Sequence, residues 1–306
     1  MTTRLFITGG AGFVGAPLVH QAVADGAEVM VLHRAGGDMA RLDAVRGHIR
    51  LLESDLADST TIREALSTFR PTKAIHLAWY AEPGKYLTSP KNVELLQQSL
   101  ALLQTLIAVG CEKAVMVGTC AEYDTDMGYL KETSPTRPST IYAASKLALA
   151  NLGEHLARAG GMDFVWARLF YLYGRAEDPR RLVPALIQSL LRDEPFSAST
   201  GDQVRDYMHA DDVAGALWHL ATHEANGVYN IASGEPVTIK LLMGKIGDIL
   251  GKSSLIRFGA LPPRPWDPPV IFGDNTRLRA TGWQPRFSLY DGLADVIAWW
   301  SRGGSG

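Results

Sequence analysis

The amino-acid sequence predicts an α/β protein built on a doubly wound parallel sheet with helices on both faces. In the first half of the chain, short apolar runs of strand length recur, and longer segments with helical periodicity lie between most of them. Strands that alternate with helices in this way pair in parallel, because each helix carries the chain back to the start of the sheet. After Gly174 prolines become frequent, which predicts a smaller second region made of shorter elements.

The elements of the first region follow in order along the chain. The predicted strands are the apolar runs 4–8, 28–32, 49–53, 74–78, 114–117 and 164–169. The predicted helices are the periodic segments 14–24, 62–69, 93–109 and 142–158. We expect one domain over 1–174, to which a later stretch near 205–232, with a core strand at 228–232, returns. We expect a second domain over 175–302, followed by a Gly/Ser tail at 303–306 that is flexible by composition.

Composition and charge exclude several classes of protein. Of the 306 residues, 46% are hydrophobic and 20% are charged, which is typical of a globular protein with a real core. A net charge of −2 and a pI near 6.4 give no electrostatic footprint for nucleic acid. No apolar run reaches the ~18 residues of a membrane span. The two cysteines, Cys111 and Cys120, allow neither a disulfide framework nor a four-thiolate zinc site, so we expect reduced thiols, a cytoplasmic protein and no metal.

A glycine cluster marks the first junction between a strand and a helix. Gly9, Gly12 and Gly15 have the spacing G-x-x-G-x-x-G directly after the first predicted strand. Glycine there permits a tight turn, close approach of a pyrophosphate to the backbone and close packing of the helix on the sheet. The helix N-terminus then faces the anion with free N–H groups. The position predicts a dinucleotide site to which Phe13 and Val14, inside the loop, also belong.

The end of the second strand indicates which dinucleotide binds. NAD-binding folds usually carry an acidic residue here for the ribose hydroxyls, whereas this chain has His33 and Arg34. Arg34 could bind a 2′-phosphate bidentately, so we expect NADP(H) to be preferred and NAD(H) to be accepted; a solvated loop arginine is the alternative. Asp55 and Leu56, after the third strand, and Ala78, after the fourth, are also expected along the cofactor.

A tyrosine and a lysine four residues apart form the predicted reactive centre. Tyr142 and Lys146 lie on one face of a predicted helix, where the ammonium is expected to lower the pKa of the phenol. Such a phenol can exchange a proton with a hydroxyl or a carbonyl. Thr119, at the carboxyl end of the fifth strand, can bond the same oxygen. We interpret His76 as a strand-end histidine with satisfied hydrogen bonds, and Trp79 as part of either a cleft wall or the core.

These motifs together resemble the extended short-chain dehydrogenase/reductases of the sugar-nucleotide epimerase/dehydratase group. The resemblance rests on TGGAGFVG, Thr119, YAASK, RLFYLYG, QVRDYMHADDVAGAL, YNIASGEPVTI and TGWQPRFSLYDGL, which occur in order over nearly the whole chain. It implies a Rossmann-like sheet with a smaller C-terminal substrate-binding domain. It also implies that Thr119, Tyr142 and Lys146 act on a hydroxyl or keto group of a sugar while a nicotinamide exchanges a hydride.

The resemblance further implies where a nucleotide sugar binds. It places Arg205 on the pyrophosphate, and Arg264 and Asp267 on the pyrophosphate or the nucleoside. Many relatives carry an asparagine where this chain has Tyr171, so the substrate contact at that position differs. Trp79 is assigned to the wall of the substrate site. The partner is therefore expected to be a nucleotide sugar.

The function that these observations favour is NADPH-dependent reduction of a nucleotide-linked 4-keto-6-deoxy sugar, with the proton from Tyr142. Dehydratases of the group place an Asp-Glu pair after the catalytic threonine, whereas this chain has Cys120 and Ala121, which argues against 4,6-dehydration. The alternatives are an NAD-dependent sugar-nucleotide 4-epimerase and, less favoured, a non-catalytic dinucleotide-binding protein. Helices 93–109 and 142–158 often pair into a homodimer in the family, although packing within one chain explains the same apolar pattern.

Overall fold

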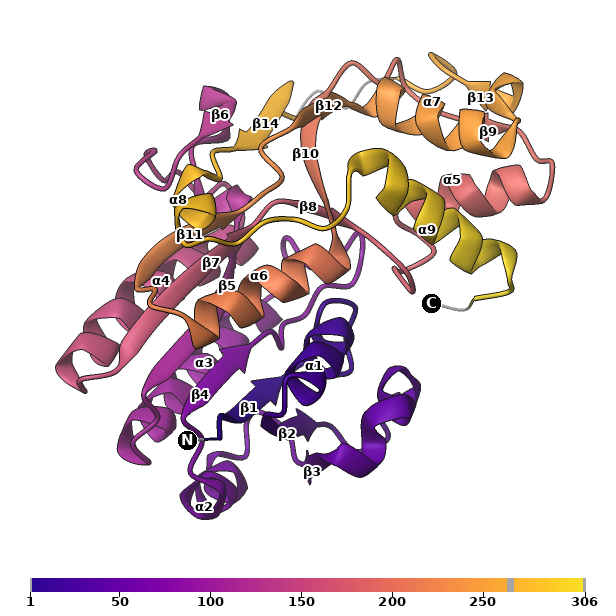
Figure 1. The fold of residues 1–306 in the computed structure, drawn as a ribbon. Helices are drawn as coiled ribbons and strands as arrows, with labels where there is room; N and C mark the ends of the chain where they lie inside the picture. Colours follow the sequence, from indigo (N-terminus) through magenta and orange to yellow (C-terminus); the bar gives the residue numbers. More distant parts are fainter. Residues whose placement is uncertain (1, 263–266, 305–306) are drawn as a thin grey trace.

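A seven-stranded parallel sheet forms the centre of the computed structural model, which describes residues 2–262 and 267–304 (Figure 1). The strand order is β11–β7–β5–β4–β1–β2–β3, and every pair is parallel. The strands are β1 (Arg4–Thr8), β2 (Glu28–His33), β3 (Ile49–Glu53), β4 (Lys73–His76), β5 (Lys113–Thr119), β7 (Asp163–Leu169) and β11 (Gly227–Ile231). The predicted α/β fold is confirmed, and each predicted strand of this sheet is present.

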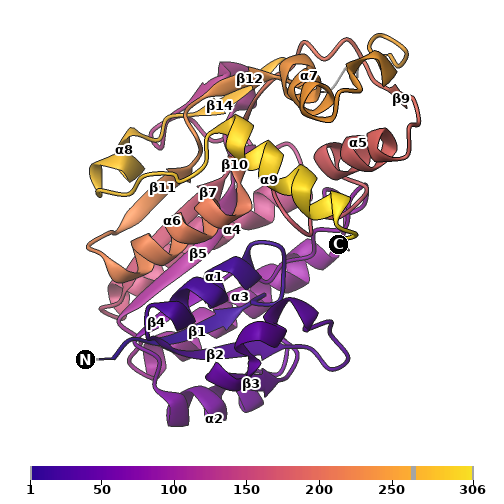
Figure 2. The same ribbon diagram turned by 45° about the vertical axis from the view of Figure 1, so that its right-hand side comes forward.

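Helices cover both faces of this sheet because the side chains of its strands alternate between two apolar layers (Figure 2). In β1, Leu5 and Ile7 join the core beneath α1 (Gly15–Ala24) and α6 (Ala210–Thr222). Phe6 points the other way and joins the core beneath α2 (Ser59–Phe69), α3 (Lys91–Ala108) and α4 (Ile141–Ala159). No helix in the described part of the chain is long and apolar enough to cross a membrane.

A smaller sheet and a second group of helices lie at one end of the large sheet (Figures 1 and 2). The strands are β12 (Pro236–Thr238), β10 (Val204–His209), β14 (Val270–Gly273) and β6 (Tyr129–Leu130), with β8 (Tyr171–Tyr173) beside β10. Around a separate apolar cluster pack α5 (Leu182–Leu191), α7 (Ile239–Leu250) and α9 (Leu289–Ser301). The remaining elements are short: β9 (Phe196–Ser197), β13 (Ile256–Arg257), α8 (Thr276–Ala280), η1 (Ala40–His48), η2 (Cys120–Glu122), η3 (Thr125–Met127) and η4 (Ser253–Leu255).

The chain crosses between the two sheets more than once, so the two regions are interleaved. It leaves the large sheet at Phe170, between β7 and β8, and returns where β10 runs into α6 at Ala210. At the end of α9, Gly303 and Gly304 donate hydrogen bonds to the carbonyls of Trp300 and Trp299, so they close the helix.

Candidate active site

Three side chains of the predicted reactive centre come from two neighbouring elements at the carboxyl edge of the large sheet. Thr119 is the last residue of β5, and Tyr142 and Lys146 lie in the first two turns of α4. The helix begins here because the hydroxyl of Thr140 accepts a hydrogen bond from the Ala143 N–H. The Tyr142 N–H donates to the carbonyl of Leu87 at 3.2 Å, which ties the start of α4 to the loop after β4.

Lys146 is buried, with only 3% of its surface exposed. Its Nζ donates to the carbonyl of Val117 on β5 at 2.7 Å and lies 3.7 Å from the centre of the Trp79 ring. Burial lowers the pKa of Lys146 to about 7, although the Glu122 carboxylate acts in the opposite direction. At neutral pH such an amine is therefore divided between its charged and uncharged forms.

The surroundings of Tyr142 differ from the expectation of a phenol with a lowered pKa. Burial raises the pKa of the Tyr142 phenol, the nearby Tyr86 phenol raises it further, and a contact with Thr119 lowers it. The expectation was wrong for the chain by itself, because burial is the largest effect on the Tyr142 phenol and it disfavours the charged phenolate. Tyr142 is therefore protonated at neutral pH, which is the form that a proton donor requires.

A buried ion pair holds the end of β5 in place beneath the reactive side chains. Glu122 is fully buried and accepts from the Thr119 N–H at 2.8 Å, from Trp166 Nε1 at 3.0 Å and from Arg168 Nε at 2.7 Å. A Cβ on Gly118 would collide with both Trp166 and Glu122. Sequence analysis missed this pair, although the spacing from Thr119 to Glu122 is that of a capping box, which the structure contains.

The glycine loop after β1 is so tightly folded that side chains at its glycines would collide with the neighbouring backbone. Gly9 has φ of +72°, and a Cβ there would lie 2.9 Å from the backbone nitrogen of Ala78. A Cβ on Gly15 would collide with the Gly9 carbonyl, and one on Gly12 would lie 3.1 Å from it. The first turn of α1 has neither an acidic residue nor a side-chain cap, so its N-terminal dipole is left for an anion. These features fit the pyrophosphate of a dinucleotide.

The other residues expected along a dinucleotide lie around this loop. Because β2 and β4 flank β1, Arg34 and Ala78 follow strands that end on either side of the loop. Arg34 is exposed, and the Ala78 N–H donates to the Thr8 hydroxyl at 3.2 Å. Asp55 is exposed after β3, whereas Leu56 is buried in the apolar layer of α2 to α4. Phe13 and Val14 complete the loop; a Cβ on Gly174 would touch the Phe13 ring at 3.1 Å.

The residues expected on the substrate side gather on the smaller sheet. Arg205 is buried on β10 and pairs with Asp267, and its guanidinium lies 5.3 Å from the centre of the Tyr171 ring. Tyr171 in turn packs against Tyr207 at 5.6 Å. In the chain by itself, Asp267 therefore neutralises the charge that was expected to meet a pyrophosphate. Arg264 lies outside the described residues.

The protonation states of two further side chains, Cys120 and His76, follow from their surroundings near Thr119, Tyr142 and Lys146, which we call the triad. Cys120, next to Thr119, is 8% exposed, and burial raises the pKa of its thiol to about 12. His76 is bonded through both ring nitrogens, with Thr8 Oγ1 2.7 Å from Nδ1 and Ser99 Oγ 2.8 Å from Nε2. Burial and then the Lys146 ammonium lower the pKa of His76 to about 3, so its ring is neutral. Within the described residues, no cluster of three or more metal-ligating side chains is present.

Comparisons with known proteins show which family and which solved structures the chain resembles. Residues 5–232 match the model of the NAD dependent epimerase/dehydratase family. A dTDP-glucose 4,6-dehydratase of Streptomyces griseus is 30% identical, over 99% of this chain and 95% of that protein. A dTDP-glucose 4,6-dehydratase of Streptomyces venezuelae, solved with NAD, superposes with a TM-score of 0.85 and 28% identity, covering 98% and 97% of the two chains. A UDP-glucose 4-epimerase of Thermotoga maritima, solved with UDP-glucose, gives 0.84 and 25% over 98% and 99%.

Proposed function

Because the chain belongs to the NAD dependent epimerase/dehydratase family of extended short-chain dehydrogenase/reductases, we propose that it reduces the keto group of a nucleotide-linked 4-keto-6-deoxy sugar with NADPH. The observation that carries the proposal is the residue set at the carboxyl edge of the sheet. Thr119, Tyr142 and Lys146 meet there, next to a cysteine instead of a carboxylate pair. Such a set can donate a proton to a carbonyl oxygen, but it lacks the Asp-Glu pair directly after Thr119 for eliminating water, and the nearby Glu122 carboxylate is buried and paired with Arg168.

Each member of the triad has one role in this proposal. Tyr142 donates its phenolic proton to the oxygen of the sugar carbonyl, and the Thr119 hydroxyl holds that oxygen in place. Lys146 binds the dinucleotide and provides positive charge near the phenol as the proton leaves. A bound dinucleotide would supply the hydride. The proposed binding site of that dinucleotide is the glycine loop, with Ala78, Asp55 and Leu56 around it.

The cysteine at position 120 favours reduction over dehydration. Its thiol has a pKa of about 12 because it is buried, so it stays neutral and neither accepts nor donates a proton readily at pH 7. The match to dehydratases therefore supports a sugar-nucleotide substrate rather than the same reaction. Substrate contacts are proposed for Tyr171, Arg205, Asp267, Arg264 and Trp79.

The preference for NADPH rests on the exposed Arg34 after β2. No carboxylate stands at this position to repel a 2′-phosphate, and a guanidinium binds phosphate in a forked geometry. The solved dehydratase of Streptomyces venezuelae contains NAD, which supports NAD(H) as a dinucleotide that this chain also accepts. Arg34 is the residue that would make the protein bind NADPH more tightly than NADH.

A second candidate function is sugar-nucleotide 4-epimerisation. It is favoured by the likeness to a UDP-glucose 4-epimerase at 25% identity, and the same triad could take a hydrogen from a hydroxyl as well as deliver one. An epimerase returns its hydride to the same sugar, so it consumes no cofactor. Net consumption of the dinucleotide therefore distinguishes the reductase from the epimerase.

The experiment supplies purified protein with NADPH and with dTDP- or UDP-linked 4-keto-6-deoxyglucose. We expect loss of the absorbance of reduced nicotinamide in proportion to a new 4-hydroxy product, which chromatography and mass spectrometry would identify. UDP-glucose and UDP-galactose alone should not be interconverted. Formation of the epimer of a 4-hydroxy sugar nucleotide, with no net oxidation or reduction of cofactor, would contradict reduction and establish the epimerase.

A further inference from the structure

The loop between β4 and α3 presses two aromatic rings against the reactive side chains. The Trp79 ring lies on Lys146, with 3.7 Å from the ring centre to Nζ. The Tyr86 ring meets Tyr142 edge to face, with 4.9 Å between ring centres and an interplanar angle of 86°. This loop therefore contacts both titratable members of the triad.

One buried amide ties the two aromatic contacts together. Asn92, at the start of α3, is fully buried, and its Oδ1 accepts from Trp79 Nε1 at 2.8 Å. Its Nδ2 donates to the carbonyls of Tyr86 at 2.6 Å and Ser89 at 2.9 Å. Both amide protons and the carbonyl oxygen are thus used within the chain. Because the amide is satisfied, its role is to fix the loop, and a ligand would have to break these bonds to reach it.

The indole is the main neighbour of the Lys146 amine that can be changed without removing a charge. The titratable groups that act on the amine or are acted on by it are His76 on β4, which is neutral, and Glu122 on η2, which is paired with Arg168. Among the described residues, no carboxylate lies within ion-pair distance of Nζ. The contacts that hold the amine are the Val117 carbonyl and the Trp79 ring.

We propose that Trp79, held by Asn92, is a positioning residue for Lys146. Its ring excludes water from one side of the amine and attracts the ammonium form through the negative face of the indole. The Val117 carbonyl occupies a second direction, so the remaining N–H is directed to the ligands of the site. This inference rests on the proposed function only in taking Lys146 as a dinucleotide ligand. It moves Trp79 from the wall of the substrate site to the support of the lysine.

The consequence for protonation follows from burial. Desolvation is the largest cause that lowers the pKa of Lys146 to about 7, and the indole covers part of the amine. A smaller aliphatic side chain at 79 would admit water, and hydration would stabilise the ammonium form by more than the lost contact with the indole face did, so this pKa would rise toward its usual value. A tryptophan that merely fills the core would lower stability on substitution but would leave the titration of Lys146 where it is.

The test measures dinucleotide affinity against pH, which needs no sugar substrate. NADPH and NADH are each titrated into the wild type, Trp79→Leu, Trp79→Phe and Asn92→Leu, and the fluorescence of the reduced nicotinamide is followed between about pH 6 and 10. We expect the wild-type affinity to fall as pH rises through the pKa of Lys146. In Trp79→Leu the midpoint of this fall should move up by about one pH unit or more. Trp79→Phe, which keeps a ring but loses the donor to Asn92, should move it less, and Asn92→Leu should move it in the same direction.

The control is Trp300→Phe on α9, whose indole nitrogen has no hydrogen-bond partner among the described residues. It removes an indole that packs in the apolar cluster of α5, α7 and α9, and should leave the midpoint unchanged. An unchanged midpoint in Trp79→Leu, or in Trp79→Phe if the leucine variant does not fold, would overturn the proposal. A shifted midpoint together with no turnover of any keto sugar would leave this role standing and remove the proposed reaction instead.

Discussion

Tyr142 is the residue on which the proposed proton transfer depends most directly. Tyr142→Phe removes the phenolic proton and keeps the ring against Tyr86, so the fold should be retained. General acid catalysis contributes about 10²–10⁴-fold, so we expect kcat to fall by that factor while the affinity for NADPH is unchanged. Steady-state kinetics and a dinucleotide titration measure the two effects. Tyr290→Phe on α9, where the ring is exposed, is the matched control and should keep wild-type turnover. Near wild-type turnover in Tyr142→Phe would exclude Tyr142 as the proton donor.

Arg34 is the residue on which the proposed preference for NADPH depends. A charge-assisted hydrogen bond contributes about 1.5–3 kcal/mol, so Arg34→Ala should weaken NADPH by about 10- to 100-fold and leave NADH almost unchanged. Parallel titrations with the two dinucleotides measure this. Arg46→Ala changes an exposed arginine on η1, which pairs with Asp43, and should alter neither affinity. Wild-type protein that binds NADH as tightly as NADPH would show that Arg34 is a solvated loop residue.

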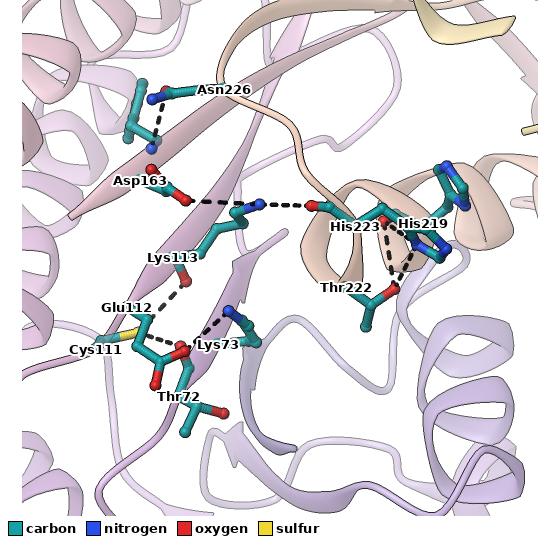
Figure 3. A network of polar contacts seen from close by, with 11 residues as sticks. Thr72, Lys73, Cys111, Glu112, Lys113, Asp163, His219, Thr222, His223 and Asn226 are labelled. Atoms are coloured by element: carbon teal, nitrogen blue, oxygen red, sulfur yellow. Dashed lines mark hydrogen bonds and ion pairs between the residues drawn. The ribbon is translucent and has the colours of Figure 1, made fainter. Parts of the chain in front are cut away.

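At the scale of elements, a lysine at the start of β5 joins three elements at the edge of the sheet away from the triad (Figure 3). Lys113 is 4% exposed, and its Nζ donates to the carbonyl of His223 at the end of α6 at 2.7 Å. The Asp163 carboxylate on β7 lies 3.8 Å away. Last-turn carbonyls of a helix lack partners within the helix, so the lysine caps α6 and fixes it on the sheet.

Lys113→Met keeps the apolar length of the side chain and removes the cap. We expect the free energy of unfolding in urea to fall by about 1–3 kcal/mol, because the half-buried hydrogen bond from the charged amine to the His223 carbonyl is lost. Lys73→Met on the neighbouring strand is the control, since Lys73 pairs with the exposed Glu112 carboxylate and such surface pairs contribute about 0–1 kcal/mol. Equal losses in the two variants would mean that the cap contributes no more than a surface pair.

The elements themselves differ in how far the sequence specified them. The helix over 142–158 and the strand over 114–117 were predicted because each carries its own periodicity, and the structure extends them to Ile141–Ala159 and Lys113–Thr119. The smaller sheet was not predicted strand by strand. Its strands β6, β8 and β12 have two or three residues each, too few for a pattern, and they form because neighbouring backbones complete their hydrogen bonds.

For the whole molecule, Glu177 makes stability depend on pH. The residue is 7% exposed, its Oε2 has no hydrogen-bond partner among the described residues, and burial raises its pKa to about 8. Between the usual carboxyl pKa and 8 the folded chain holds a proton that the unfolded chain releases, so this group destabilises the fold as pH rises through that window. Glu177→Gln should therefore raise the melting temperature relative to wild type at pH 8, with little difference near pH 4.

Melting curves of both proteins across this range measure the effect, and the comparison cancels the titration of the other groups. Glu64→Gln on the exposed side of α2 is the control and should give the same difference at every pH. A Glu177→Gln variant whose stability relative to wild type does not change with pH would show that Glu177 is ionised in the folded protein.

The sequence by itself determined the α/β fold, the glycine loop and which residues are proposed as the triad, because short-range spacing carries each of them. Tyr142 and Lys146 are about one helical turn apart, and the three glycines of the loop all fall within residues 9–15. Only the tertiary structure decided what surrounds them. Arg168 reaches Glu122 across 46 positions, Trp79 and Lys146 meet from different elements, and the pKa of Tyr142 is set by burial. Such contacts follow from how helices pack on a finished sheet, and no local pattern in the chain encodes them.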